Sequence, residues 1–125
     1  MPQILIVEDD EPTQRMLQAL LRRSSFGCEL ASNGAQAIAL LKEKSFAAVV
    51  LDMMMPEVGG ADVIQFLRDG GNKTPVIVCS AAGPRALAEL DTSIVQAVVR
   101  KPFDIDEFLT AVTRVTGNRQ PDSRG

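Results

Sequence analysis

The sequence predicts an α/β fold in which a parallel β-sheet lies between two layers of helices. Short apolar runs rich in Val, Ile and Leu recur along the chain, and such runs are typical of strands that are buried on both faces. Segments with helical periodicity separate these runs. An alternation of strands and helices favours a parallel sheet with right-handed crossovers, which leaves few topologies.

Five strands are predicted, at residues 4–7, 28–31, 47–51, 76–79 and 94–99. The run at 28–31 has the weakest apolar pattern of the five. The chain has five Phe and neither Trp nor Tyr, so its core must be mainly aliphatic. A length of 125 residues with 46% hydrophobic content is sufficient for one domain with a substantial core.

Five helices are predicted between and after these strands, at residues 13–23, 35–44, 61–68, 85–90 and 104–115. The first has one apolar stripe formed by Met16, Leu17, Leu20 and Leu21. Either Asp10 or Glu11 can cap it, and Pro12 suits its first turn. The apolar residues of the last helix are Ile105, Phe108, Leu109 and Val112.

The last helix also fixes the expected end of the domain, because Asp104 suits its N-cap and Gly117 its end. Residues 118–125 are polar and aperiodic. We therefore expect a domain over residues 1–117, followed by a polar C-terminal tail or a truncated linker at 118–125.

Composition excludes several classes of function. A net charge of −3 and the absence of a clustered basic face argue against direct binding of nucleic acid. The chain has no histidine, which excludes His-based catalytic triads and the common zinc sites. Cys28 and Cys79 form no CxxC pair and are expected to be buried thiols. The N-terminus lacks a signal peptide or membrane span, so we expect a cytoplasmic protein with no membrane partner.

Polar residues follow four of the predicted strands. In chain order they are Glu8, Asp9 and Asp10, then Asp52, then Ser80, and finally Arg100 and Lys101. Each has an ordinary explanation, such as a helix cap, a turn or a solvated charge. The carboxyl ends of parallel strands, however, share one edge of the sheet. The joint occurrence of these residues therefore predicts a site at that edge.

The predicted site suits phosphoryl transfer to a carboxylate. Glu8, Asp9 and Asp52 would repel one another unless a cation lay among them, and an all-oxygen ligand set favours Mg²⁺. Asp52 would then be the nucleophile. The Ser80 hydroxyl and the Lys101 ammonium would bind oxygens of the transferred group.

Four segments together resemble the receiver domain of bacterial response regulators, proteins of two-component signalling that include the chemotaxis regulators. They are ILIVEDD at 4–10, LDMMMPEVGG at 51–60, PVIVCSA at 75–81 and VVRKPF at 98–103. The resemblance extends to about residue 116. It implies a flavodoxin-like, doubly wound, five-stranded parallel sheet with (βα)5 order and three α/β/α layers.

The resemblance also implies a role for each matching residue. Asp52 corresponds to the phosphoacceptor, Asp9 and Glu8 to the acids that bind Mg²⁺, and Met54 to a ligand through its backbone carbonyl. Ser80 corresponds to the switch Ser/Thr and Lys101 to the lysine that pairs with phosphate, with a cis bond to Pro102. The phosphoryl group would come from a partner, either a sensor histidine kinase or a histidine phosphotransfer protein. The output would be a downstream effector protein or a missing C-terminal output domain.

The chain departs from the usual receiver pattern in three places. Val98 replaces the common Tyr or Phe of the switch, so its aromatic half is absent. Gly59 replaces a frequent Asp, and Gly59-Gly60 should loosen that loop. Met54 and Ala82 occupy positions that tune attack by water, and neither side chain can orient a water molecule. Slow loss of the phosphoryl group is therefore expected.

Two alternatives are weighed against a phosphorylation switch. A phosphatase of the dehalogenase type also uses an Asp at a strand end, but it needs a second acid where this chain has Met54. A degenerate receiver acting as a phosphorylation-independent docking domain is opposed by the complete acidic, hydroxyl and lysine set, although Val98 favours it. No GxGxxG follows the first strand, which argues against a dinucleotide-binding enzyme. We expect a signalling protein that catalyses only its own phosphorylation and dephosphorylation.

Overall fold

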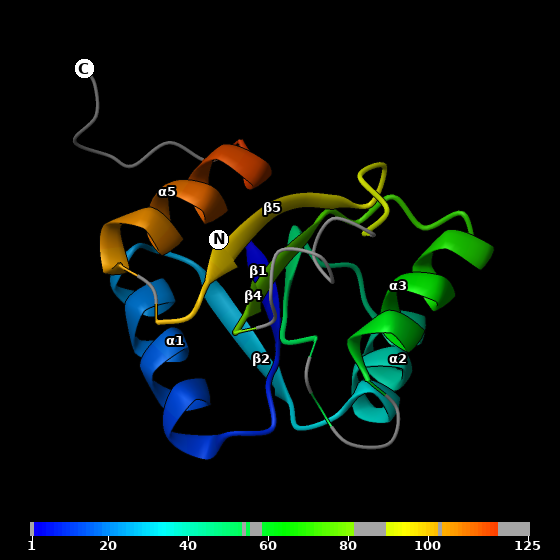
Figure 1. The fold of residues 1–125 in the computed structure, drawn as a ribbon, viewed down its shortest axis with the longest axis horizontal. Coiled ribbons are helices and arrows are strands. Elements are labelled where there is room, and N and C mark those ends of the chain that lie inside the picture. The colour runs from blue at the N-terminus through cyan, green and yellow to red at the C-terminus, as the bar shows by residue number, and fades with distance from the viewer. Residues whose placement is uncertain (1, 54, 56–58, 82–89, 103, 118–125) are drawn as a thin grey trace.

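The computed structural model describes residues 2–53, 55, 59–81, 90–102 and 104–117. Five parallel strands form one sheet in the order β2-β1-β3-β4-β5 (Figure 1). The strands are β1 Gln3–Val7, β2 Gly27–Ala31, β3 Ala48–Leu51, β4 Val76–Ser80 and β5 Val95–Arg100. The helices within these residues are α1 Glu11–Arg23, α2 Gly34–Glu43, α3 Gly60–Asp69 and α5 Ile105–Thr116.

The predicted α/β fold with five parallel strands is confirmed, as are four of the five predicted helices. The helix predicted at 85–90 lies almost entirely outside the described residues. Two strand ends differ from the prediction, because Ser80 and Arg100 belong to β4 and β5 and pair with each other. These polar residues extend the two strands because the backbone of each still pairs with the neighbouring strand.

Helices cover both faces of the sheet, with α1 and α5 on one side and α2 and α3 on the other (Figure 1). Alternate residues of each inner strand enter the two cores. In β1, for example, Ile4 and Ile6 pack with α1 and α5, whereas Leu5 and Val7 pack with α2 and α3. Within the described part of the chain, no helix combines the length and apolar character needed to cross a membrane.

The strands at the two edges of the sheet are less buried than predicted. β1, β3 and β4 are apolar and buried along nearly their whole length, but β2 and β5 contain exposed and half-buried residues. Only inner strands have a strand on each side and a helix layer on each face. Val98 in β5 illustrates the difference, with 41% of its surface exposed.

Two apolar residues of the predicted helices are exposed. Met16, assigned to the apolar stripe of the first helix, is 43% exposed, and Ile105, named among the apolar residues of the last helix, is 49% exposed. Gln14 is buried in α1 instead, beside Leu17 and Leu21 on the inner face. Helical spacing gives an average direction for a stripe, so residues at its margins can be assigned to the wrong side.

The capping residues predicted for the first and last helices are confirmed by hydrogen bonds. Asp10 caps α1 by accepting the backbone N–H of Thr13, and Asp104 caps α5 by accepting that of Glu107. Gly117 ends α5 in the left-handed conformation, with φ of 70°, which glycine adopts without steric cost.

Both cysteines are free thiols, as expected, but only Cys79 is fully buried. Burial raises the pKa of Cys79 to about 12 and that of half-buried Cys28 to about 11. Because the thiolate is the reactive form of cysteine, neither residue is an effective nucleophile at neutral pH.

Gly60, the first residue of α3, lies against the chain that leaves β3. A Cβ atom at this position would come within 2.6 Å of the Met53 Sδ, 2.8 Å of the Met53 Cα and 3.0 Å of the Asp52 carbonyl oxygen. Two of these three atoms are backbone and cannot move aside cheaply. The glycine thus permits a close approach between α3 and the peptide that follows Asp52.

We predict that Gly60→Ala lowers the free energy of unfolding by about 1–3 kcal/mol, because overpacking against backbone forces local shifts. Gly70→Ala, at the other end of α3, is the matched control, since its Cβ would meet only the Phe66 carbonyl oxygen at 3.4 Å. Urea unfolding of the two variants and the wild type measures both effects. Equal stabilities for the two variants would contradict the predicted contact.

Candidate functional site

The carboxyl ends of β1, β3 and β5 bring Glu8, Asp52 and Lys101 together. The residues two positions before them, Ile6, Val50 and Val99, all pack in the core beneath α1 and α5. Because side chains alternate along a strand, the next residue of the same parity continues on that side. These three side chains therefore leave the edge of the sheet toward the α1 and α5 layer.

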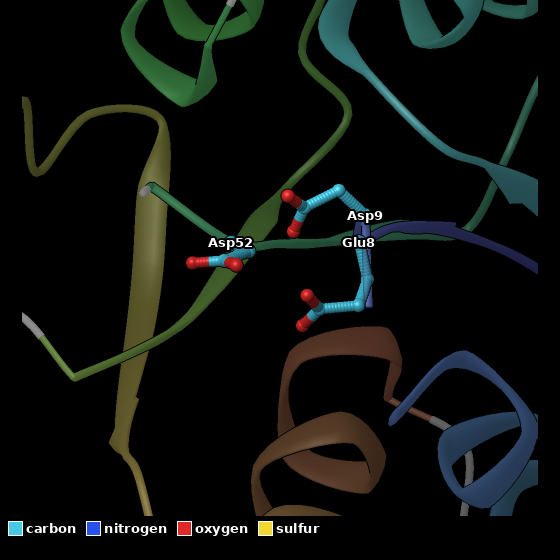
Figure 2. Close-up of side chains that lie close together, drawn as sticks. All are labelled: Glu8, Asp9 and Asp52. Carbon is cyan, nitrogen blue, oxygen red and sulfur yellow. The ribbon is translucent and has the colours of Figure 1, made fainter. Parts of the chain in front are cut away.

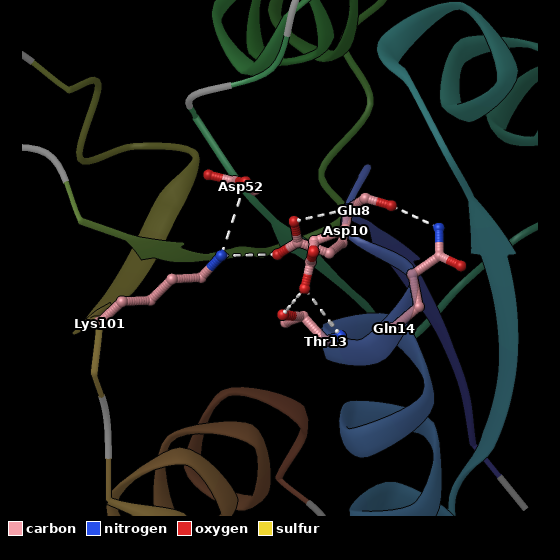
Figure 3. A network of polar contacts seen from close by, with 6 residues as sticks. All are labelled: Glu8, Asp10, Thr13, Gln14, Asp52 and Lys101. Carbon is pink, nitrogen blue, oxygen red and sulfur yellow. Dashed lines mark hydrogen bonds and ion pairs between the residues drawn. The ribbon is translucent and has the colours of Figure 1, made fainter.

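The Lys101 ammonium lies between two carboxylates at this edge. Its Nζ is 2.7 Å from the Glu8 Oε1 and 3.6 Å from the Asp52 Oδ2 (Figure 3). The Lys101 side chain is 23% exposed and that of Glu8 only 3%. A buried carboxylate requires such a partner, because burial without one costs several kcal/mol.

Burial and ion pairing at this edge change the pKa values of Glu8 and Lys101. Burial raises the pKa of Glu8, and the hydrogen bond from Lys101 only partly opposes this effect. Burial lowers the pKa of Lys101, but its hydrogen bond to Glu8 and the negative charge of Asp52 outweigh burial and raise it overall. Lys101 is consequently a cation at neutral pH.

Asp9 completes an acidic cluster with Glu8 and Asp52. One carboxylate oxygen from each residue lies within 4.8 Å of the other two. Figure 2 shows Glu8 and Asp9 leaving the end of β1 in different directions, with the Asp52 carboxylate beside them at the end of β3. Glu8 and Asp52 are buried, whereas Asp9 is exposed.

This donor set fits a hard divalent cation. Carboxylate oxygens are the ligands that Mg²⁺ prefers, and Mg²⁺ usually retains several waters rather than filling its coordination sphere with protein. An exposed acid beside two buried ones leaves one side of the cluster open to solvent. Met54, predicted to contribute a backbone carbonyl, lies outside the described residues.

The loop between β1 and α1 holds the Glu8 carboxylate in place. The Glu8 Oε2 accepts the backbone N–H of Asp10 at 3.2 Å. Asp10 itself accepts both the hydroxyl and the backbone N–H of Thr13 (Figure 3), and these bonds lower the pKa of Asp10. Asp10 is therefore occupied in capping α1, while Glu8 and Asp9 remain at the edge.

Ser80 and Lys101 are linked through their main chains. Ser80 is the fully buried last residue of β4, and its carbonyl oxygen accepts the Lys101 backbone N–H at 3.0 Å. The Lys101-Pro102 bond is cis, as the resemblance implied. The structure thus places Ser80 at the same edge as Asp52, with β3 and β4 as neighbours in the sheet.

One residue of this region was missed by sequence reasoning. The Gln14 side chain donates hydrogen bonds to the Glu8 carbonyl oxygen and to the Ser32 Oγ. The available signal was a polar residue three positions before Leu17, on the inner face of the predicted helix. Periodicity alone assigned this helix face to apolar residues.

Comparison with known proteins is consistent with this geometry. The model of the response regulator receiver domain family matches residues 4–113. The chain belongs to this family.

Curated relatives of this receiver domain include the uncharacterized transcriptional regulatory protein YkoG of Bacillus subtilis. It is 34% identical over 124 residues, which are 95% of this chain and 54% of YkoG. The response regulator MprA of a Mycobacterium species is 32% identical over 121 residues, or 95% of this chain and 52% of MprA. The receiver domain thus spans about half the length of these relatives.

Solved structures share the fold. The receiver domain of Francisella response regulator 1452 has a TM-score of 0.87 and 26% identity, and the match covers 94% of this chain and 98% of that one. The response regulator TrrA from Thermotoga maritima, solved in complex with Mg²⁺-BeF, has a TM-score of 0.84 and 24% identity, with coverage of 92% and 99%. The flavodoxin-like arrangement predicted for the chain is confirmed.

We predict that replacing Lys101 with Met destabilises this receiver domain. The Glu8 carboxylate would lose a hydrogen bond in a buried position, which should lower the free energy of unfolding by about 1–3 kcal/mol. Urea unfolding at neutral pH without divalent metal measures the loss.

Adding Glu8→Gln to that variant should recover part of the stability, because it removes the unpaired charge. The two changes should therefore be non-additive, as expected for residues in direct contact. If the Lys101 variant were as stable as the wild type, or the two effects were additive, the ion pair would not contribute as described.

Proposed function

We propose that this receiver domain is a phosphorylation switch in which Asp52 accepts a phosphoryl group from a phosphohistidine. The donor would be a sensor histidine kinase or a histidine phosphotransfer protein. The observation that carries the proposal is a cluster of three carboxylates with one oxygen of each within 4.8 Å of the other two. Two of these carboxylates, Glu8 and Asp52, lie beside the Lys101 Nζ, at 2.7 Å and 3.6 Å. A degenerate docking domain would have no need to hold these charges together.

Asp52 is suited to be the nucleophile. It follows the buried strand β3 directly, and its backbone N–H donates to the Val7 carbonyl oxygen at 3.0 Å, so the carboxylate is held on a rigid element. A carboxylate oxygen of Asp52 forms the bond to phosphorus while the P–N bond of phosphohistidine breaks. The electron pair of that bond stays on the imidazole nitrogen. The ring leaves as neutral imidazole if its other nitrogen carries a proton, and otherwise the released nitrogen takes up a proton.

Glu8, Asp9 and Asp52 would hold Mg²⁺, together with the backbone carbonyl of Met54. The bound ion would neutralise charge on the transferred group and reduce the repulsion among the acids. The carboxylates of this chain supply the ligands, and the exposed position of Asp9 leaves room for water and phosphate oxygens. Support comes from the donor set itself and from membership of the receiver family.

Lys101 and Ser80 would bind the oxygens of the phosphoryl group. The ammonium already lies beside the Asp52 Oδ2, so a short movement would bring it to a phosphate oxygen. The Ser80 hydroxyl would be the second donor. Because the Ser80 carbonyl oxygen accepts the Lys101 N–H, movement of one residue would affect the other and transmit the signal along β4 and β5.

The output of the switch would be a change in binding of a downstream effector or of a C-terminal output domain. YkoG, which is named as a transcriptional regulatory protein, and the response regulator MprA are each about twice as long as the part that matches this chain, which supports an output segment of that kind. Val98 is a half-exposed aliphatic residue on β5. The signal would therefore pass through Ser80 and its loop without an aromatic rotation.

Incubation with Mg²⁺ and a small phosphodonor such as acetyl phosphate tests the proposal. We expect intact mass spectrometry to detect the mass of one phosphoryl group, and we expect no gain in Asp52→Ala or when Mg²⁺ is chelated. Asp62→Ala, which removes an exposed carboxylate at the start of α3, is the matched control and should be phosphorylated normally. A wild-type protein that gains no mass would indicate the docking alternative.

The phosphoryl group is expected to be lost slowly, because neither Met54 nor Ala82 can orient an attacking water. Both positions lie outside the described residues, so this remains a prediction from side-chain chemistry. Met54→Asn should shorten the half-life of the phosphorylated protein. The half-life is measured by mass spectrometry, as the rate at which the added mass is lost after the phosphodonor is removed. An unchanged half-life in that variant and in Ala82→Glu would contradict it.

A further inference from the structure

Gln14 is a buried polar residue on the inner face of α1. It is 7% exposed, whereas the apolar Met16 on the same helix is 43% exposed. Burial of a primary amide is unfavourable unless its hydrogen bonds are made, at a cost of about 1–3 kcal/mol in proteins. A buried glutamine at a position where an apolar side chain would fit therefore indicates that its hydrogen bonds have a role.

The Gln14 amide joins two loops at the edge of the sheet. Its Nε2 donates to the main-chain carbonyl oxygen of Glu8, in the loop after β1, and to the Ser32 Oγ at 3.2 Å, in the loop after β2. Two N–H groups are available and these two acceptors use them. Figure 3 shows Gln14 and Lys101 on opposite sides of Glu8.

The second of these loops is a firm anchor. The Ser32 backbone N–H donates to the Gln36 Oε1 at 2.8 Å, and the Gln36 backbone N–H donates to the Asn33 Oδ1 at 2.8 Å. These bonds form the N-terminal cap of α2. Through Ser32, Gln14 connects the carbonyl of Glu8 to the start of a helix on the other face of the sheet.

The direction of Asp9 depends on this connection. The Glu8 backbone N–H donates to the Ala31 carbonyl oxygen at 3.0 Å and the Glu8 carbonyl accepts from Gln14, so both sides of this residue are held. Within the described part of the chain, no hydrogen bond is found that holds the Asp9 carboxylate. The Glu8–Asp9 peptide plane therefore sets the backbone position from which that exposed carboxylate extends.

We propose that Gln14 is a positioning residue for the cation site formed by Glu8, Asp9 and Asp52. By fixing the peptide between the two acids, it keeps three mutually repelling carboxylates in the arrangement that a divalent cation needs. Without it, part of the binding free energy would be spent on ordering the loop. This inference rests on the proposed function, since it assumes that the cluster binds Mg²⁺.

Gln14→Met tests the proposal because methionine has nearly the same length and shape but donates no hydrogen bond. We expect the Mg²⁺ dissociation constant, measured by isothermal titration calorimetry, to rise about tenfold, the lower end of the effect of losing a group that orients metal ligands. Gln18→Met makes the same change one turn further along α1, at a half-buried position. Its Mg²⁺ affinity should equal that of the wild type.

The melting temperature of each metal-free protein separates positioning from stability. A purely structural role for Gln14 would lower the melting temperature and leave the Mg²⁺ affinity of the folded protein unchanged, and this result would overturn the proposal. If Gln14→Met does not fold, Ser32→Ala decides, because it removes the anchor at an exposed position. A weaker Mg²⁺ affinity in that variant supports the proposal, and an unchanged one overturns it.

The wild type distinguishes this inference from the function on which it rests. If the wild type binds no Mg²⁺, the cation site and the role of Gln14 are both wrong. If the wild type binds Mg²⁺ and is phosphorylated on Asp52, but Gln14→Met binds the ion equally well, only the role of Gln14 is wrong.

Discussion

The ion pair between Lys101 and Glu8 is the interaction on which the rest of the site depends. Three acids at one edge of a sheet repel one another, and two of them are buried. The Lys101 ammonium, 2.7 Å from the Glu8 carboxylate and 3.6 Å from the Asp52 carboxylate, offsets this repulsion. The pair also joins β1 to β5, which are separated in the sheet by β3 and β4. The same ion pair therefore offsets the repulsion among the acids and connects two strands that are not neighbours in the sheet.

The strict alternation of side chains along parallel strands explains how such a contact forms without a dedicated loop. Ile6, Val50 and Val99 are buried under α1 and α5, and the next residue of the same parity on each strand is Glu8, Asp52 or Lys101. The hydrophobic core therefore orients the polar site, because the apolar residues fix the strand faces. Asp9 has the opposite parity and lies apart from the lysine, on the side that is open to solvent.

Much of the fold and of the site could be predicted from local sequence. Apolar runs located the strands, Asp10, Asp104 and Gly117 located helix ends, and the polar residues after the strands located the cluster. The predictions that were wrong concern features that depend on tertiary packing. Met16 and Ile105 have suitable spacing, yet they lie at the margins of their stripes. Gln14 has a polar side chain of the kind usually found at the surface, and only its hydrogen bond to the Glu8 carbonyl explains its burial. Register and strand order likewise depend on contacts that no single segment contains.

The close fit at Gly60 has a mechanical consequence. The Met53 Cα and the Asp52 carbonyl oxygen lie within about 3 Å of the point that a Cβ would occupy at Gly60, so the first residue of α3 packs directly against the peptide that follows Asp52. A rotation of that peptide would press on the start of α3. This contact couples the first turn of the helix mechanically to the acidic edge.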